Sequence, residues 1–157
     1  MKGLRKMAAW RVKRDPDDEQ GAALVEFAVV SLLLFTLLFG IVEAGWLFNQ
    51  QLEMRHGARE GARLTATNYV GGDAAVAAEV CDRMHFSGAR AATTVRIQAG
   101  TGIGDTATVT VATPYSGLTG FLDQFFGGVT LSSEVDVRLE QVPGAGLGTD
   151  TDFNCSP

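Results

Sequence analysis

One acidic side chain stands near the start of a long apolar segment of this chain. Residues 22–48 read AALVEFAVVSLLLFTLLFGIVEAGWLF, in which only Glu26 and Glu43 are charged. An unpaired carboxylate in apolar surroundings is costly and seeks a partner, so an acid in such a segment is a functional candidate. Near a helix N-terminus a carboxylate is favourable by about 0.3–1 kcal/mol when exposed, because the helix dipole is positive there. Glu26 is therefore expected to bind a partner; the alternative is that it only sits at a lipid interface.

Two cysteines and a stripe of arginines are the other side chains that could do chemistry. Cys81 and Cys155 are the only cysteines, so a single intrachain disulfide is possible if both lie in an oxidising compartment. A buried Cys81 with a free thiol at Cys155 is the alternative. Cys81 and His85, four residues apart, could share a metal, but no further ligand pair is spaced to complete a site. The sequence predicts no metal and no cofactor.

The arginines follow the apolar segment at four-residue spacing. Arg55, Arg59 and Arg63 would share one face of a helix, where like charges slightly destabilise each other. Such a stripe either faces solvent or forms ion pairs with acids of the same chain or of a neighbouring subunit. No Ser-His-Asp or Cys-His arrangement and no pair of catalytic carboxylates is recognisable, so we expect a protein that is not an enzyme.

Charge is distributed unevenly along the chain. Its 157 residues carry a net charge of −5. Residues 1–21 hold six basic and four acidic side chains, a net +2, whereas residues 22–157 hold seven arginines and fourteen acids, a net −7. This balance gives no basic surface for a nucleic acid. The basic leader before the apolar segment predicts a cytoplasmic N-terminus and an extracytoplasmic C-terminal part.

The elements that position these side chains begin with one long helix. At 1.5 Å per residue, residues 22–48 would reach roughly 40 Å, enough to cross a hydrocarbon core of about 30 Å. Good helix formers continue this helix outside the membrane to about residue 66. Within the extension, small residues recur one turn apart and would let another backbone approach closely. These residues are Gly57, Ala58, Gly61 and Ala62.

The remainder predicts a small α+β domain. Residues 73–85 read as a second helix, and strict alternation of apolar and polar residues in 93–99, 106–113 and 129–141 indicates antiparallel strands with one buried face. We expect a three- or four-stranded sheet packed on the long helix. An apolar stretch containing Leu118, Phe121, Leu122, Phe125 and Phe126 is expected to plug the core. The predicted organisation is a leader (1–21), a transmembrane helix (22–48), its extension (49–66), an outer domain (67–142) and a flexible tail (143–157).

The junction between leader and helix resembles a type IV prepilin cleavage site. A basic leader is followed by Gly21, Ala22, and then Glu26 and Phe27, and this Glu-Phe pair is similar to that of Flp-type and Tad pilins and pseudopilins. The resemblance implies cleavage between Gly21 and Ala22 by a prepilin peptidase. It also implies that Glu26 neutralises the new amine of a neighbouring subunit during assembly.

A second resemblance covers the helix and the outer domain. The run GAREGAR at residues 57–63 and the ending VTVATPYSGLTGFLDQFFGGVTLSSEVDVRLE are similar to TadE-like proteins, over about residues 18–141. This implies a pseudopilin, or minor pilin, of a tight-adherence pilus used for adhesion. Its partners would be other pilin or pseudopilin subunits, the inner-membrane assembly platform and membrane lipid. It would be a single-pass protein of the cytoplasmic membrane, with or without incorporation into a surface pilus.

A secreted or signal-anchored protein with no pilus role is the competing interpretation. Val42, Glu43 and Ala44 resemble the V-x-A pattern that signal peptidase reads, which would make Gly45 the new N-terminus. Against this, the leader is long, Glu43 lies beside the cut, and the apolar helix continues without a break.

Overall fold

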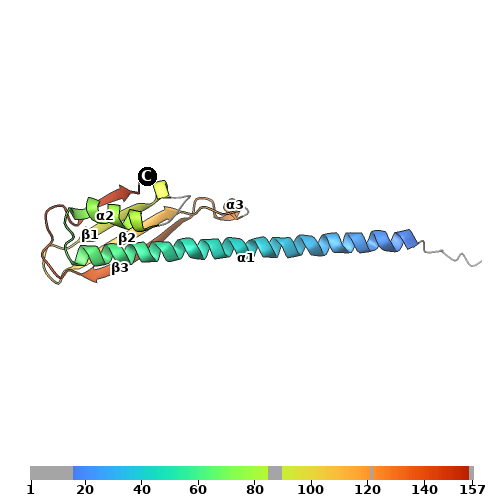
Figure 1. Cartoon of the computed structure of the whole chain (residues 1–157), viewed down its shortest axis with the longest axis horizontal. Helices are drawn as coiled ribbons and strands as arrows, with labels where there is room; N and C mark the ends of the chain where they lie inside the picture. Colours follow the sequence, from blue (N-terminus) through green and yellow to red (C-terminus); the bar gives the residue numbers. More distant parts are fainter. Residues whose placement is uncertain (1–15, 85–89, 121, 156–157) are drawn as a thin grey trace, which may run out of the picture. The chain divides into compact units, whose positions relative to one another are not determined.

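A long helix and a four-stranded sheet are the main elements of the chain (Figure 1). The computed structural model describes residues 16–84, 90–120 and 122–155. It contains two compact units, residues 1–38 and 39–157, and the boundary between them falls inside the first helix. The helices are α1 (Pro16–Ala66), α2 (Gly72–Arg83), the 3₁₀ turn η1 (Arg90–Ala92) and α3 (Asp123–Phe126). The strands are β1 (Thr94–Ala99), β2 (Thr106–Pro114), β3 (Thr130–Arg138) and β4 (Thr149–Asn154).

In the first unit, α1 from Gly21 to Leu38 is apolar on all sides apart from Glu26 and two hydroxyl side chains. From Gly21 to Leu38 no side chain is buried, and large apolar residues such as Leu24 and Leu33 are exposed on every face. A helix that is apolar all round needs an apolar environment. Its two hydroxyl side chains bond back to the helix itself, Ser31 to the carbonyl of Ala28 and Thr36 to that of Leu32. No hydroxyl donor of this stretch is therefore left unpaired in lipid.

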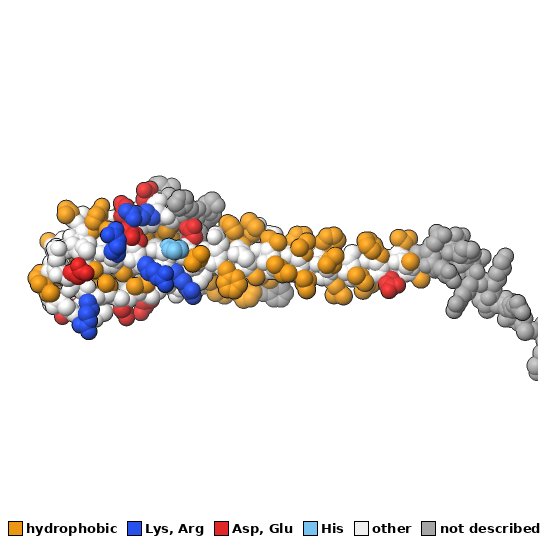
Figure 2. Space-filling model, turned by 60° about the horizontal axis from the view of Figure 1, so that its bottom comes forward, with side chains coloured by type: hydrophobic (Ala, Val, Ile, Leu, Met, Phe, Trp, Pro, Cys, Tyr) orange, Lys and Arg blue, Asp and Glu red, His pale blue; other side chains and the backbone are white. Residues whose placement is uncertain are grey.

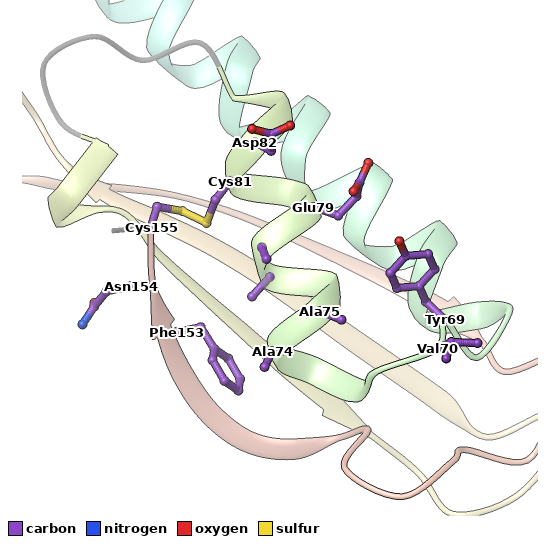
Figure 3. Close-up of a pocket in the computed structure, with 12 residues that line it drawn as sticks. Tyr69, Val70, Ala74, Ala75, Glu79, Cys81, Asp82, Phe153, Asn154 and Cys155 are labelled. Atoms are coloured by element: carbon purple, nitrogen blue, oxygen red, sulfur yellow. A yellow bond between two sulfur atoms is a disulfide. The ribbon is translucent and has the colours of Figure 1, made fainter. Parts of the chain in front are cut away.

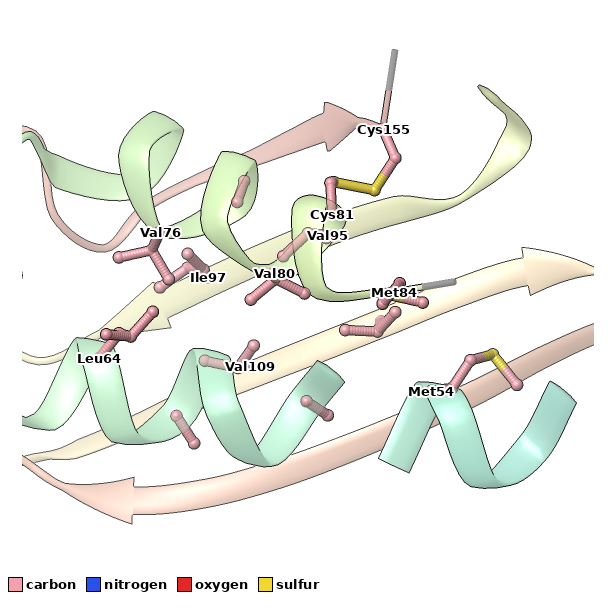
Figure 4. Packing of buried hydrophobic residues seen from close by; sticks show 14 residues of the cluster. Met54, Leu64, Val76, Val80, Cys81, Met84, Val95, Ile97, Val109 and Cys155 are labelled. Carbon is pink, nitrogen blue, oxygen red and sulfur yellow. A yellow bond between two sulfur atoms is a disulfide. The ribbon is translucent and has the colours of Figure 1, made fainter. Parts of the chain in front are cut away.

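In the second unit, the strand order is β3-β2-β1-β4, and all neighbours are antiparallel. The outer part of α1 and the whole of α2 pack on one face of this sheet, so the predicted α+β fold is confirmed (Figure 4). Val95 faces Val111 across the ladder and Ile97 faces Val109, and all four are fully buried. Alternation places the polar residues of the same strands on the opposite, solvated face.

The strip of small residues on α1 is buried within its own chain. A Cβ on Gly57 would lie 2.9 Å from Met84 Sδ, and a Cβ on Gly61 would lie 2.9 Å from Val109 Cγ1. Both distances are too short for a real contact, so a Cβ at either position would force the Met84 or Val109 side chain to shift. Ala58 and Ala62 are also buried. Side chains of the same chain, rather than the backbone of another element, therefore cover this strip.

The prediction of a flexible tail over residues 143–157 is wrong for its second half. Thr149–Asn154 forms β4, which pairs with β1 so that Phe153 faces Val95 and Asp152 faces Arg96. The guanidinium of Arg96 donates to both carboxylate oxygens of Asp152 at 2.7 Å. The sequence missed this strand because TDTDFN has only one apolar residue, as suits an edge strand with little to bury.

Both ends of β4 are held by α2. The buried carboxylate of Asp73 accepts hydrogen bonds from the Gly148 and Thr149 amides and from the Thr149 hydroxyl, all at 2.7 Å. At the other end, Cys155 is joined to Cys81 by a disulfide, with their Cα atoms 5.3 Å apart. The last residues of the described chain are thereby part of the folded unit.

The prediction that the apolar stretch before β3 plugs the core is also wrong. A short helix does form, α3, but Leu118 is 54% exposed and Phe126 is 43% exposed. Phe121 and the side chain of Phe125 lie outside the described residues. The core shared by α1 and the sheet is completed instead by Val76 and Val80 of α2. An apolar segment beyond the end of the sheet is left without a place in the core.

Candidate assembly site

The residues of the predicted cleavage junction lie together on α1. Gly21, Ala22, Glu26 and Phe27 are all exposed, and Phe27 is 70% exposed. Glu26 follows Ala22 by four residues, so the two positions share one face of the helix, one turn apart. No hydrogen bond or ion pair is formed by Glu26 within the part of the chain that the structure describes. The carboxylate of Glu26 is therefore available to bind a group of another molecule.

The second acid of the apolar segment has the opposite environment. Glu43 is fully buried and accepts four hydrogen bonds, two on each oxygen. Oε1 receives the Tyr115 hydroxyl at 3.0 Å and the Leu118 amide at 3.1 Å. Oε2 receives the amide of Thr119 at 3.1 Å and its hydroxyl at 2.7 Å. Burial, together with the hydrogen bond to this carboxylate, raises the pKa of the Tyr115 hydroxyl to about 12.

The next turns of the helix hold the same segment. Trp46 Nε1 donates to the carbonyl of Ser116 at 3.0 Å, and Gln50 Nε2 donates to the same oxygen at 2.6 Å. Glu43, Trp46 and Gln50 follow one another at helical spacing and so form one polar face. Sequence reasoning missed this cluster because its partners lie 66–76 residues away. An acid at the end of an apolar segment, followed by Trp and Gln on one face, was the signal that could have revealed it.

The arginine stripe splits into two kinds of environment. Arg63 donates to both carboxylate oxygens of Glu60 from its Nε and Nη2 atoms, at 3.1 and 2.7 Å. The same carboxylate is 2.7 Å from Arg83 of α2. The hydrogen bond from Arg63 lowers the pKa of Glu60. Arg55 and Arg59 are exposed and form no ion pair among the described residues. Figure 2 shows several basic side chains on the face of the second unit that is turned forward in that view.

The surface beside the disulfide offers little chemistry. The hollow there is lined mainly by alanines of α2, by Tyr69 and by Phe153, with Cys81 and Cys155 at its end (Figure 3). Because Cys81 is bonded to Cys155, it has no thiolate for a metal, and His85 lies outside the described residues. Within the described part of the chain, no group of three or more His, Cys, Asp or Glu side chains is placed to hold a metal ion.

These features together define a class of protein. One helix, 46 residues long from Gly21 to Ala66, is long and apolar enough to cross a membrane, and none of its most apolar stretch is buried within the structure. Since the helix is not a core helix, it indicates a membrane-anchored protein with a small α+β domain.

The comparisons with known proteins add the family. The model of the family described as TadE-like protein matches residues 21–63, which include the junction, the apolar segment and the arginine stripe. The match confirms the resemblance over this region, so residues 21–63 are similar to TadE-like proteins of the Tad/Flp pilus system. Components of this kind are associated with Tad pili and are structural rather than enzymes. No curated protein and no solved structure was found to match the chain.

Proposed function

We propose that the chain is a pseudopilin that acts structurally in the assembly of a Tad/Flp pilus for adhesion. A prepilin peptidase would cleave it between Gly21 and Ala22. Glu26 would then pair with the amine of a neighbouring pilin or pseudopilin subunit, close to the assembly platform in the cytoplasmic membrane. The observation that supports this most strongly is the position of Glu26, which is exposed in an apolar segment and has no partner among the described residues. The orientation, with the N-terminus cytoplasmic, is supported by the six basic residues of the leader.

The position of Glu43 argues against the secreted alternative. Cleavage after Ala44 would remove Glu43 from the second unit and leave the amides of Leu118 and Thr119 without their acceptor. The buried hydroxyl of Tyr115 would lose its acceptor as well, and a buried donor without a partner costs roughly 1–3 kcal/mol. A cut at this point would therefore damage the domain that it released.

Replacement of Glu26 by leucine is expected to leave membrane insertion intact and to impair assembly. The substitution lengthens the apolar run, so insertion is not opposed. It removes the acceptor for the amine of Ala22. Each 1.4 kcal/mol lost from that pairing lowers the equilibrium constant for adding a subunit about tenfold. The measurement is the amount of pili sheared from cells, alongside the amount of the chain in membranes.

A matched control is Thr36→Leu, which removes a polar side chain from the same exposed segment without removing a charge. It should leave the yield of pili unchanged. Wild-type yield from Glu26→Leu would show that Glu26 only lies at the lipid interface.

A further inference from the structure

The segment between β2 and β3 exposes apolar side chains that the core does not use. This segment, residues 116–129, is called here the Glu43 loop. Leu118, Phe126 and Val129 are 54%, 43% and 42% exposed. The loop contains no Lys or Arg, and its one acid, Asp123, accepts a hydrogen bond from the Gly117 amide at 3.0 Å. Such a cluster on a small domain marks an interaction surface.

The hydrogen bonds of the loop fix its level along α1. Leu118 and Thr119 are bonded to Glu43, and Ser116 is bonded to Trp46 and Gln50. In Figure 1, α3 lies beyond the ends of β2 and β3. Residues 22–43 would extend roughly 33 Å at 1.5 Å per residue, close to the thickness of a hydrocarbon core of about 30 Å. The loop therefore lies where a membrane-spanning α1 leaves the lipid.

The side chains of α1 and of the loop near Glu43 favour contact with lipid over contact with a protein partner. The helix is itself apolar and exposed beside the loop, with Phe39 at 46%, Val42 at 43% and Phe48 at 73%. Trp46 has an indole N–H bonded to the loop, and tryptophan is enriched at membrane interfaces. The carboxylate that could have opposed burial in lipid accepts hydrogen bonds from three donors of the loop and from the Tyr115 hydroxyl just before it. The apolar surface of the loop thus continues the lipid-facing surface of the helix.

We propose that the Glu43 loop is a second membrane contact, with Leu118 and Phe126 in the outer interface of the lipid bilayer. The hydrogen bonds to Glu43 hold the loop in this position. This inference rests on the proposed membrane-spanning arrangement of α1. It gives the outer domain two attachments to the bilayer, a spanning helix and an interfacial loop. Two attachments restrict how the domain can tilt and rotate on the membrane surface.

Photo-crosslinking of the full chain in vesicles tests the contact. Benzoylphenylalanine replaces Leu118 or Phe126 in separate variants, and the purified chains are reconstituted into phosphatidylethanolamine and phosphatidylglycerol vesicles. Position 103 is the matched control, because Ile103 is 67% exposed and lies in the turn before β2, at the other end of that strand. Position 33 is the positive control within the apolar segment.

After irradiation, mass spectrometry should find lipid adducts at positions 118 and 126 and none above background at 103. Adducts only to a second copy of the chain, or no adduct at either position while position 33 labels lipid, would overturn the inference. If position 33 itself fails to label lipid, the spanning arrangement is wrong and the inference falls with it.

A second variant tests whether Glu43 holds the loop in place. Glu43→Gln replaces one carboxylate oxygen by an amide donor, which then faces a backbone N–H of the loop, from Leu118 or Thr119, instead of accepting from it. We expect the lipid adduct at position 118 to be lost or strongly reduced. Glu140→Gln, a change of an exposed acid, should have no effect on it. An unchanged adduct in Glu43→Gln would show that Glu43 does not hold the loop.

Discussion

Replacement of Gly21 by leucine should leave the leader attached to the chain. A peptidase at the membrane surface must draw an extended backbone through a narrow site, and glycine lacks the Cβ that would obstruct it. The folded chain itself has no need for glycine here, because a Cβ at position 21 would meet nothing within 4 Å. Failure of processing would thus reflect recognition by the peptidase and not damage to the fold. Intact-mass measurement of the membrane-extracted variant, expressed with the peptidase, decides between cut and uncut chains.

Gly40→Leu is the matched control for this experiment. Gly40 lies in the same helix, and a Cβ there also meets nothing within 4 Å, so the two substitutions make the same chemical change. It should be processed as the wild type is. Normal processing of Gly21→Leu would refute the assignment of this glycine to a peptidase site.

Loss of the disulfide should destabilise the second unit more than most single substitutions. Cys81 and Cys155 are separated by 74 residues, and closing a loop of that length contributes about 4 kcal/mol in the chain-entropy model. The bond also secures the free end of β4, an edge strand with one half-buried apolar residue, Phe153. At roughly 4 °C per kcal/mol for a domain of this size, the double replacement Cys81→Ser, Cys155→Ser should lower Tm by on the order of 15 °C. Circular dichroism of the detergent-solubilised chain measures this shift.

Reductant provides the control for the disulfide. It should lower Tm of the wild-type chain to about the value of the double variant and leave the double variant unchanged. Alkylation of both thiols in the wild-type chain without any reductant would contradict the bond.

Regular patterns made much of this fold predictable. The long helix was expected to end near residue 66 and does end at Ala66, since the run of helix formers stops there. The alternation of apolar and polar residues predicted β1, β2 and β3 because the less exposed face of each strand is a period-two pattern, buried in β1 and β2 and half-buried in β3. The helix over residues 73–85 is present as α2 from Gly72 to Arg83. All of these elements follow from local order in the sequence.

The features that escaped prediction depend on contacts distant along the chain. β4 forms because Asp73 and the disulfide to Cys81 hold a polar segment against β1. Asp73 and Cys81 both lie far from this segment in the sequence. Glu43 is positioned by Tyr115, Leu118 and Thr119, which no local pattern connects to it. The apolar loop was assigned to the core because hydrophobicity alone does not distinguish a core position from an exposed interaction surface.

The position of the first residue of the processed chain tests the central claim most directly. The full chain is expressed together with a prepilin peptidase, extracted from membranes, and sequenced from its N-terminus. A cleaved pseudopilin should begin Ala22-Ala23-Leu24, with Glu26 as its fifth residue. A chain that begins at Gly45, with Glu43 removed from the outer domain, would contradict this account and establish the secreted alternative.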